Sequence, residues 1–380
     1  MSIVSIVKCE SYAPGDVRSA VDQAIDLAEL RDSLVNRRVL LKPNLLSARK
    51  PQDSVTTHPE IVRAIGEIAA ESGSRVSVGD SPPFAGRSEE KYARLCEITG
   101  IAQVARSIDA QLVRFESASN TIVSERGHIY KSFEIADAVS GADVVVNIPK
   151  LKTHGLTGFT GAIKNIFGCI PGVRKGFFHV QAAEDRTVFA QMLVDLFALV
   201  RPGVHVMDAV VGMDGDGPNN GNPKPIGLIL ASGDPVALDA VACAVVGIDP
   251  LSIETTRLAS KQGLGCGDLN DIEIRGECID DVRVEGFKLS SGRSEWKKIP
   301  FPIRRLLRRQ LIAIPIIRQR QCTGCGDCVT VCPVNAITAG KPAAINLERC
   351  IRCYCCAEVC NFSAIELKRG LIGRLLKSGR

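Results

Sequence analysis

Two dense cysteine runs near the carboxyl end constrain this chain more than any other feature. Residues 322–332 read CTGCGDCVTVC and residues 350–360 read CIRCYCCAEVC, and together they hold nine of the 15 cysteines. A chain of 380 residues with 45% hydrophobic composition can fold on its own core, so it needs no disulfide staples. No signal-peptide pattern and no apolar run of membrane-spanning length is visible in the sequence, which predicts a cytoplasmic, reducing location. Clustered cysteines in that setting are expected to bind metal or to do redox work.

The spacing within the two runs is typical of iron–sulfur ligands. Each run follows C-x2-C-x2-C-x3-C, in which three thiolates hold one cluster and the fourth is projected toward the neighbouring cluster. We therefore expect two [4Fe–4S] clusters with interlocked ligands. The first set is Cys322, Cys325, Cys328 and Cys360, and the second set is Cys350, Cys353, Cys356 and Cys332. Zinc is the alternative, because C-x2-C pairs also build zinc sites, but two matched runs without histidine favour iron–sulfur clusters.

Residues 320–368 resemble the bacterial two-cluster ferredoxin domain. An internal repeat, CPVNAIT against CNFSAIE, is similar to the pseudo-twofold of that fold. Two positions depart from the family pattern. Asn361 replaces the proline expected after the last cysteine of the second run, and Cys355 is an extra thiol beside Cys356. Spacing alone leaves open whether Cys355 can replace a ligand.

The sequence ahead of the runs alternates short β-branched segments with helical ones. The helical pattern is clearest at 58–72 and 234–247, and the strand-like segments are RVLLK at 38–42, RVSVGD at 75–80, ADVVVNIPK at 142–150, VHVMDAVV at 204–211 and IGLILAS at 226–232. Uniformly apolar strands separated by helices are typical of a parallel sheet covered on both faces. We therefore expect an α/β domain with a mostly parallel sheet at 1–295, and a small α+β ferredoxin-like domain at 321–368.

Polar residues follow most of these predicted strands. If the strands are parallel, such residues meet at the carboxyl edge of the sheet, where open α/β sheets place ligands. The candidates for proton transfer and catalysis are Lys150, Lys152, His154, Asp80 and Asp208. The candidates for substrate binding are Lys42, Asn44, Gly158, Gly161, Lys164, Asn165, Asp214 and Asp216. Any one of them can equally be a turn residue or a solvated cap.

Two loops support this hypothesis. Residues 154–168 place glycines before a predicted helix that carries Lys164 and Asn165, so its first backbone N–H groups are candidates for holding an anion. The loop at 212–223 would let two aspartates approach a ligand or a hard cation, although a plain surface loop fits equally well. His154 and His179 lie beside these features, and a histidine there can move a proton near neutral pH.

Residues 3–290 resemble the family named domain of unknown function 362. The resemblance rests on LLKPNLL, THPEIVRAI, GDSP, IPKLKTHGLTGFTGAIKNIFGCIPG and GDPVALDAVACAVVGIDP. It implies an α/β domain associated with iron–sulfur proteins, often with an appended ferredoxin-like domain. It implies no agreed reaction.

Positive charge is concentrated around the cysteine runs. Residues 293–320 hold nine Lys/Arg and one Glu, and the tail at 369–380 is also basic. We expect a linker at 296–320 that contains a short basic amphipathic helix near 303–313. Such a helix can meet an anionic membrane or an acidic partner, or pack on the core of its own chain. Nucleic-acid binding is not expected, because no motif for it is present.

Two classes of function stay open. In the first, the chain is an oxidoreductase that exchanges single electrons with an external carrier protein and delivers them to an anionic small molecule at the strand ends. In the second, it is an electron-transfer or iron–sulfur accessory protein whose α/β domain binds a partner or metabolite without turning it over.

Overall fold

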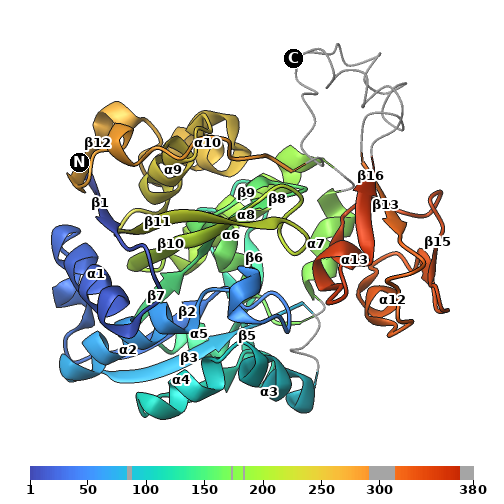
Figure 1. Cartoon of the computed structure of the whole chain (residues 1–380), viewed down its shortest axis with the longest axis horizontal. Coiled ribbons are helices and arrows are strands. Elements are labelled where there is room, and N and C mark those ends of the chain that lie inside the picture. The colour runs from blue at the N-terminus through green and yellow to red at the C-terminus, as the bar shows by residue number, and fades with distance from the viewer. Residues whose placement is uncertain (84–87, 173, 183–184, 291–312, 369–380) are drawn as a thin grey trace.

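The computed structural model describes residues 1–83, 88–172, 174–182, 185–290 and 313–368. A large α/β unit is followed by a small cysteine-bearing unit that lies against one side of it (Figure 1). We call residues 1–290 the α/β unit and residues 313–368 the cysteine unit.

One large sheet runs through the α/β unit. Its strands lie in the order β12-β1-β11-β10-β7-β2-β3-β4, and β8 and β9 extend it beside β10. The neighbours β12–β1, β10–β7, β7–β2, β2–β3 and β3–β4 are parallel, whereas β11 is antiparallel to both of its neighbours. The strands are β1 (Ser2–Lys8), β2 (Arg38–Pro43), β3 (Arg75–Asp80), β4 (Gln111–Arg114), β7 (Val144–Ile148), β8 (Lys150–His154), β9 (Gly158–Thr160), β10 (Val204–Asp214), β11 (Asn222–Ser232) and β12 (Ile272–Gly276). The predicted α/β fold with a mostly parallel sheet is confirmed.

Both faces of the sheet are covered because its inner strands are apolar on both sides. Val39 and Leu41 of β2 pack into one core, and Leu40 between them packs into another, as the alternation of a strand requires. The first core takes α1 (Pro14–Leu27), α2 (Pro59–Glu71), α3 (Glu89–Ile98) and α4 (Ile101–Ser107). The other face takes α6 (Ala162–Asn165), α8 (Arg186–Val200), α9 (Pro235–Val245) and α10 (Glu254–Lys261). Smaller elements are α5 (Asp137–Ser140), α7 (Arg174–Ala182) and the hairpin of β5 (Ser119–Val123) and β6 (Ser132–Ala136).

Helix α9 shows how the sequence anchors an element in this core. All of its residues are buried, and a fully buried Val or Leu side chain stabilises a fold by about 1.5–3 kcal/mol. Asp234 caps its start by accepting hydrogen bonds from the N–H groups of Val236 at 2.8 Å and Ala237 at 3.2 Å. The Gly-Asp-Pro sequence that opens this segment is therefore a turn and a helix cap, and it fixes α9 against β11.

The cysteine unit consists of two halves with similar structures. It contains β13 (Ile314–Ile317), α12 (Asp327–Val331), β14 (Ile337–Thr338), β15 (Ala344–Ile345), α13 (Cys355–Val359) and β16 (Ile365–Lys368). β13 pairs with β16, and β14 pairs with β15. The amide of Ala336 donates to Cys332 Sγ at 3.1 Å, and the amide of Ala364 donates to Cys360 Sγ at 3.2 Å. Corresponding positions in the two halves thus make the same contact.

The predictions for the linker and the tail can be compared with the structure only in part. The unit already begins at β13, which lies inside the predicted 296–320 linker. Except for Ala313, the basic helix expected at 303–313 lies outside the described residues, and so does the 369–380 tail. Among the residues that the structure describes, no helix combines the length and apolar character that crossing a membrane requires.

Candidate functional site

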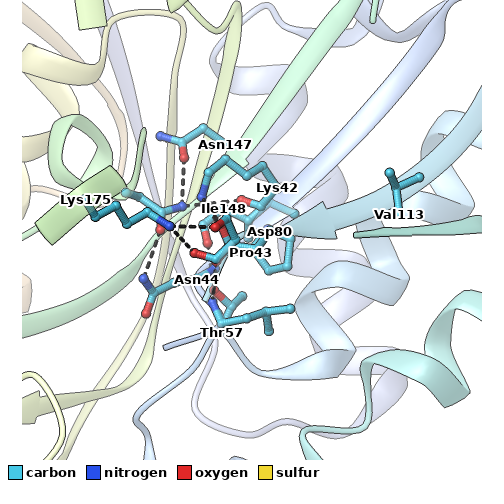
Figure 2. Close-up of polar contacts among 12 residues, drawn as sticks. Lys42, Pro43, Asn44, Thr57, Asp80, Val113, Asn147, Ile148 and Lys175 are labelled. Carbon is cyan, nitrogen blue, oxygen red and sulfur yellow. Dashed lines mark hydrogen bonds and ion pairs between the residues drawn. The ribbon is translucent and has the colours of Figure 1, made fainter. Parts of the chain in front are cut away.

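The parallel strands end under the cysteine unit, and buried charges gather there. Lys42 Nζ lies 2.9 Å from Asp80 Oδ1, an ion pair between the ends of β2 and β3 in which both side chains are almost fully buried. Lys175 of α7 reaches the same place and donates to Ser81 Oγ at 2.7 Å. Figure 2 shows Lys42, Asp80 and Lys175 meeting at this edge. Since a buried charge must be paired, each ammonium here is tied to a specific neighbour.

A second buried ion pair joins the start of β8 to the middle of β10, so Asp208 does not follow the end of a strand as the sequence predicted. Lys150 Nζ lies 2.8 Å from Asp208 Oδ2, and both side chains are fully buried. Tyr12 joins them, because its hydroxyl accepts from Lys150 at 2.8 Å and donates to Asp208 Oδ1 at 2.8 Å. The ring of Tyr12 stacks on His58 with 3.6 Å between centroids, and burial lowers the pKa of His58 to about 4. This cluster therefore presents a neutral imidazole next to a fixed ion pair.

Amide side chains link the strand ends to α6. Lys152 Nζ donates to Asn44 Oδ1 at 2.7 Å, and Asn44 donates to Asn165 Oδ1 at 3.0 Å. Asn165 in turn donates to Asn147 Oδ1 at 2.8 Å. Burial, and then the positive charge of Lys164, lowers the pKa of Lys152 well below its ordinary value. The chain of amides fixes Asn44, Asn165 and Lys152 relative to one another.

His154 makes a buried polar contact between the two units. Its Nδ1 accepts from the amide of Leu156 at 3.0 Å, so in the neutral ring Nε2 carries the proton, and Nε2 lies 2.9 Å from Glu358 Oε1. Burial lowers the pKa of His154 to about 4. Burial opposes ionisation of Glu358, but His154 and then Lys164 outweigh it and hold the pKa of Glu358 at about 2. Glu358 is therefore an ionised carboxylate inserted from the cysteine unit into the α/β unit.

These groups surround a pocket between the two units with a free volume of about 80 Å³, enough for several waters or a small anion. From the α/β unit it is lined by Asn44, Asp80, Ser81, Lys164, Asn165, Lys175 and His179. From the cysteine unit it is lined by Val331, Cys355 and Glu358. His179 Nδ1 is buried without a hydrogen-bond partner in the structure, and the ring stacks on Phe189. We call this the interdomain pocket.

The titration of its amines suits proton transfer. Burial lowers the pKa of Lys175 to about 8 and lowers that of Lys164. Burial also lowers the pKa of His179 to about 4, so its ring is neutral at physiological pH. A lysine with a pKa near the working pH can both hold an anion and give or take a proton. The pocket therefore contains groups that are chemically able to hold an anion and to exchange a proton.

Four residues predicted to bind substrate have other roles in the structure: Gly158, Gly161, Asp214 and Asp216. The helix after Gly161 does not offer its N–H groups to a ligand, because Asp239 accepts from the amides of Ala162 at 2.5 Å and Ile163 at 3.1 Å. Gly158 lies in the β8–β9 hairpin opposite His154. Thus the expected anion site at a helix start is wrong, and α6 with Ala162–Asn165 is too short to form one.

The two aspartates of the 212–223 loop also lie away from this pocket. Asp214 ends β10 and accepts from the amide of Lys288 at 3.2 Å. Asp216 lines a second cavity of about 110 Å³, which shares only Glu358 with the interdomain pocket among the residues described. The same loop holds the cysteine unit, since Asn219 donates to the carbonyl of Cys360 at 2.8 Å. It forms part of the interface between the units.

The cysteine thiols of the two runs influence one another's titration. Burial, and then the thiols of Cys325, Cys360 and Cys322, raises the pKa of Cys328 to about 11. Burial likewise raises the pKa of Cys350, with further contributions from Cys353 and Cys332. Nowhere in the described residues do three or more Cys, His, Asp or Glu converge as they would on one metal ion. In an iron–sulfur cluster each cysteine thiolate binds a separate iron, and the eight cysteines of the two runs are donors of that kind.

Sequence reasoning missed several residues of this site. Lys175 and Tyr12 stand in no motif, and His58 lies in THPEIVRAI without being singled out there; only the fold brings them to the strand ends. Glu358 and Cys355 lie inside the second cysteine run, where they were read only against the ligand pattern. A comparison of the two runs position by position is the signal that points to them, because the first run has Thr330 and Asp327 there.

Comparisons with known proteins agree with both parts of the chain. Residues 39–244 match the model of the family described as domain of unknown function 362, and residues 314–361 match that of the 4Fe-4S dicluster domain. A thylakoid-associated protein of Synechocystis sp. is 33% identical over 264 residues, which cover 69% of this chain and 79% of that protein.

Two solved structures show a weak likeness at low identity. The lactate racemase apoprotein from Thermoanaerobacterium thermosaccharolyticum is 14% identical with a TM-score of 0.40, and the match covers 62% of this chain and 55% of that one. A Thermotoga maritima protein is 12% identical with a TM-score of 0.37, and the match covers 67% of this chain and 60% of that one. This chain thus spans little more than half the length of those structures.

The family matches agree with the sheet, the strand-end residues and the gathered cysteines. This chain belongs to the domain of unknown function 362 family, and it is an iron–sulfur protein with a C-terminal 4Fe-4S dicluster domain.

Proposed function

We propose that this chain is an oxidoreductase that passes single electrons through two [4Fe–4S] clusters to an anionic small molecule bound in the interdomain pocket. One observation carries the proposal: the second cysteine run forms a wall of the pocket that Lys164 and Lys175 line from the other side. A redox group held at that wall would lie next to the bound molecule. The proposed setting is the cytoplasm.

The pocket residues divide the work between binding and proton transfer. Lys164 and Lys175 attract the anionic group of the substrate, and the unpartnered Nδ1 of His179 can donate a hydrogen bond to it in the tautomer that carries its proton there. Lys175, with a pKa of about 8, can supply the proton that accompanies an added electron. The buried pairs Lys42–Asp80 and Lys150–Asp208 hold the strand ends in place around them.

The cysteine sets would hold the redox groups. Cys322, Cys325, Cys328 and Cys360 suit one cluster, and Cys350, Cys353, Cys356 and Cys332 suit the other. When bound, such clusters supply single electrons at potentials that their surroundings tune. Ala336 and Ala364 donate amide hydrogen bonds to one cysteine sulfur of each set, and such bonds help to set the potential.

A second function is an electron-transfer or iron–sulfur accessory protein without catalysis. It is favoured by Glu358, which already occupies a cationic part of the pocket and pairs with His154. On this alternative the lysines anchor the cysteine unit and bind no substrate.

Anaerobic purification followed by anion titration tests the proposal. We expect about eight irons and eight sulfides per chain, and zinc in their place would contradict the two clusters. The dithionite-reduced protein is then titrated with phosphate and with small carboxylates while its electron paramagnetic resonance spectrum is recorded. We expect a saturable change in the spectrum that Lys164→Ala and Lys175→Ala weaken at least tenfold. The exposed Lys261→Ala is the matched control, and if all three variants behave alike the accessory function is preferred.

A further inference from the structure

The two halves of the cysteine unit are related by a shift of 28 residues. Each ligand of the first run has its counterpart 28 positions later: Cys322 and Cys350, Cys325 and Cys353, Cys328 and Cys356, Cys332 and Cys360 (350 − 322 = 28). The same shift relates α12 to α13, and it relates the amide–sulfur contacts of Cys332 and Cys360. Positions where the halves differ therefore report what each half does beyond holding its ligands.

The second half differs where it meets the α/β unit. Tyr354 replaces Gly326, packs among the apolar residues of that unit and donates to the carbonyl of Ala313 at 2.9 Å. Cys355 replaces Asp327 and lines the interdomain pocket. Glu358 replaces Thr330 and pairs with His154. The second run thus carries residues that contact the α/β unit, and all residues of its helix α13 are buried.

The first cysteine run is only partly buried. All residues of α12 are exposed or half-buried, and Cys325 is exposed. The loop around Cys325 is flanked by Gly324 and Gly326, which have φ values of +75° and +81°. A Cβ added at 326 would meet no atom of the described residues within 4 Å, so this side of the loop is open within the part of the chain that the structure describes. A second protein can therefore approach these cysteines closely.

Charge identifies the kind of partner. Within 313–368, the exposed charged residues are the basic Arg318, Arg320, Lys341, Arg349 and Lys368 and the acidic Glu348. Lys341 lies against the loop itself, because a Cβ placed on Gly324 would lie 3.2 Å from the Lys341 Cβ. A basic surface attracts an acidic protein, and such attraction raises the association rate.

We propose that residues 320–326 and Lys341 form a docking face for an acidic one-electron carrier protein. The carrier is oxidised by one electron, and the first set's cluster is reduced by one. No proton or bond change is needed in this step. The inference rests on the proposed function only in that the cysteine sets hold clusters, and it adds the entry surface and the class of donor.

Stopped-flow reduction of the anaerobic, iron-complete protein tests the docking face. The probe is a pre-reduced acidic [2Fe–2S] ferredoxin, and bleaching of the acceptor's cluster absorbance is followed without any substrate. We expect Lys341→Glu and Arg320→Glu each to lower the second-order rate constant about three- to tenfold at low salt. The difference should shrink as salt is raised. Arg75 lies at the amino end of β3, far from the carboxyl ends of the strands, so Arg75→Glu should have the same second-order rate constant as the unaltered protein.

Reduction by dithionite separates docking from cluster damage. All variants should react with this small reductant at the same rate. Equal rates with ferredoxin for all variants, or a loss in Arg75→Glu as large as in Lys341→Glu, would overturn the docking face. A docking effect without any anion response would uphold this inference while the proposed substrate pocket fails, so the two outcomes are distinguishable.

Discussion

The two cysteine runs have the same spacing but opposite surroundings. The first run lies at the surface of the molecule, and the second is buried against the strand ends of the α/β unit. The ligand positions are shared, so the contrast comes from the residues between them: Gly326, Asp327 and Thr330 in one run, and Tyr354, Cys355 and Glu358 in the other. Spacing thus defines the ligands, and the intervening residues decide where each half lies.

The largest effect should come from a cysteine that joins the two halves. We predict that Cys360→Ser lowers iron to less than half of about eight per chain, because Cys360 completes the first set from within the second run. The exposed Cys325→Ser should lose one cluster and keep about four irons. Iron and sulfide counts with spin quantitation check this. Because both side chains belong to the first set, the cluster that remains should give the same spectrum in the two variants, and different spectra would contradict the interlocked ligands.

Acid should lower the free energy of unfolding, because buried histidines stay neutral in the folded protein. Burial holds the pKa of four of the five histidines at about 4, and two of them, His154 and His179, lie beside the second run. The unfolded chain binds these protons below about pH 6.5 and the folded chain does not, so the free energy of unfolding falls as pH drops from 6.5 toward 4. Each histidine contributes at most about 1.4 kcal/mol per pH unit.

Thermal unfolding across this pH range measures the effect. His179→Phe keeps the aromatic packing on Phe189 and removes one titrating ring, so it should flatten the slope below pH 6.5. An unchanged slope would show that His179 is protonated in the folded protein.

Glu358 and Thr330 occupy equivalent positions and offer a matched pair of variants. Glu358→Ala leaves the buried His154 Nε2 without an acceptor, and it should destabilise the docked state by about 2–3 kcal/mol. The exposed Thr330→Ala should stay within about 0.5 kcal/mol. Losing a negative charge next to Cys356 and Cys360 should also raise the cluster potentials. Denaturation and redox titration check both points, and similar results for the two variants would remove the contrast between the runs.

The smallest effect should come from Tyr354→Phe. The change removes the hydrogen bond to the Ala313 carbonyl, which ties the start of the cysteine unit to its second run, and it should cost about 1 kcal/mol. Limited proteolysis near the start of the cysteine unit provides the measurement, and faster cleavage is the expected result. Unchanged cleavage would mean that this hydrogen bond does not hold the start of the unit in place.

The sheet was predictable because its inner strands are apolar along their whole length. The strand segments at 38–42, 75–80 and 142–150 became β2, β3 and β7, and their ends brought Lys42, Asp80 and Lys150 to one edge. The antiparallel placement of β11 was not predicted, because an apolar strand reads the same in either direction.

The site was only partly predictable, because its key contact joins residues far apart in the chain. Glu358 and His154 meet only after the two units dock, and no local pattern around either residue encodes that event. The glycines before α6 misled for a related reason: the donors they seemed to offer were taken by Asp239 from another helix.

The burial of α13 bears on how the protein is made. Cys356 and Cys360 pack within the cysteine unit's own core, whereas Cys355 and Glu358 of the same helix line the pocket against the α/β unit. Because one short helix carries both ligands and interface residues, a chain without its iron would lose the shape on which docking depends. Loading of the C-terminal unit would then come before its docking on the α/β unit.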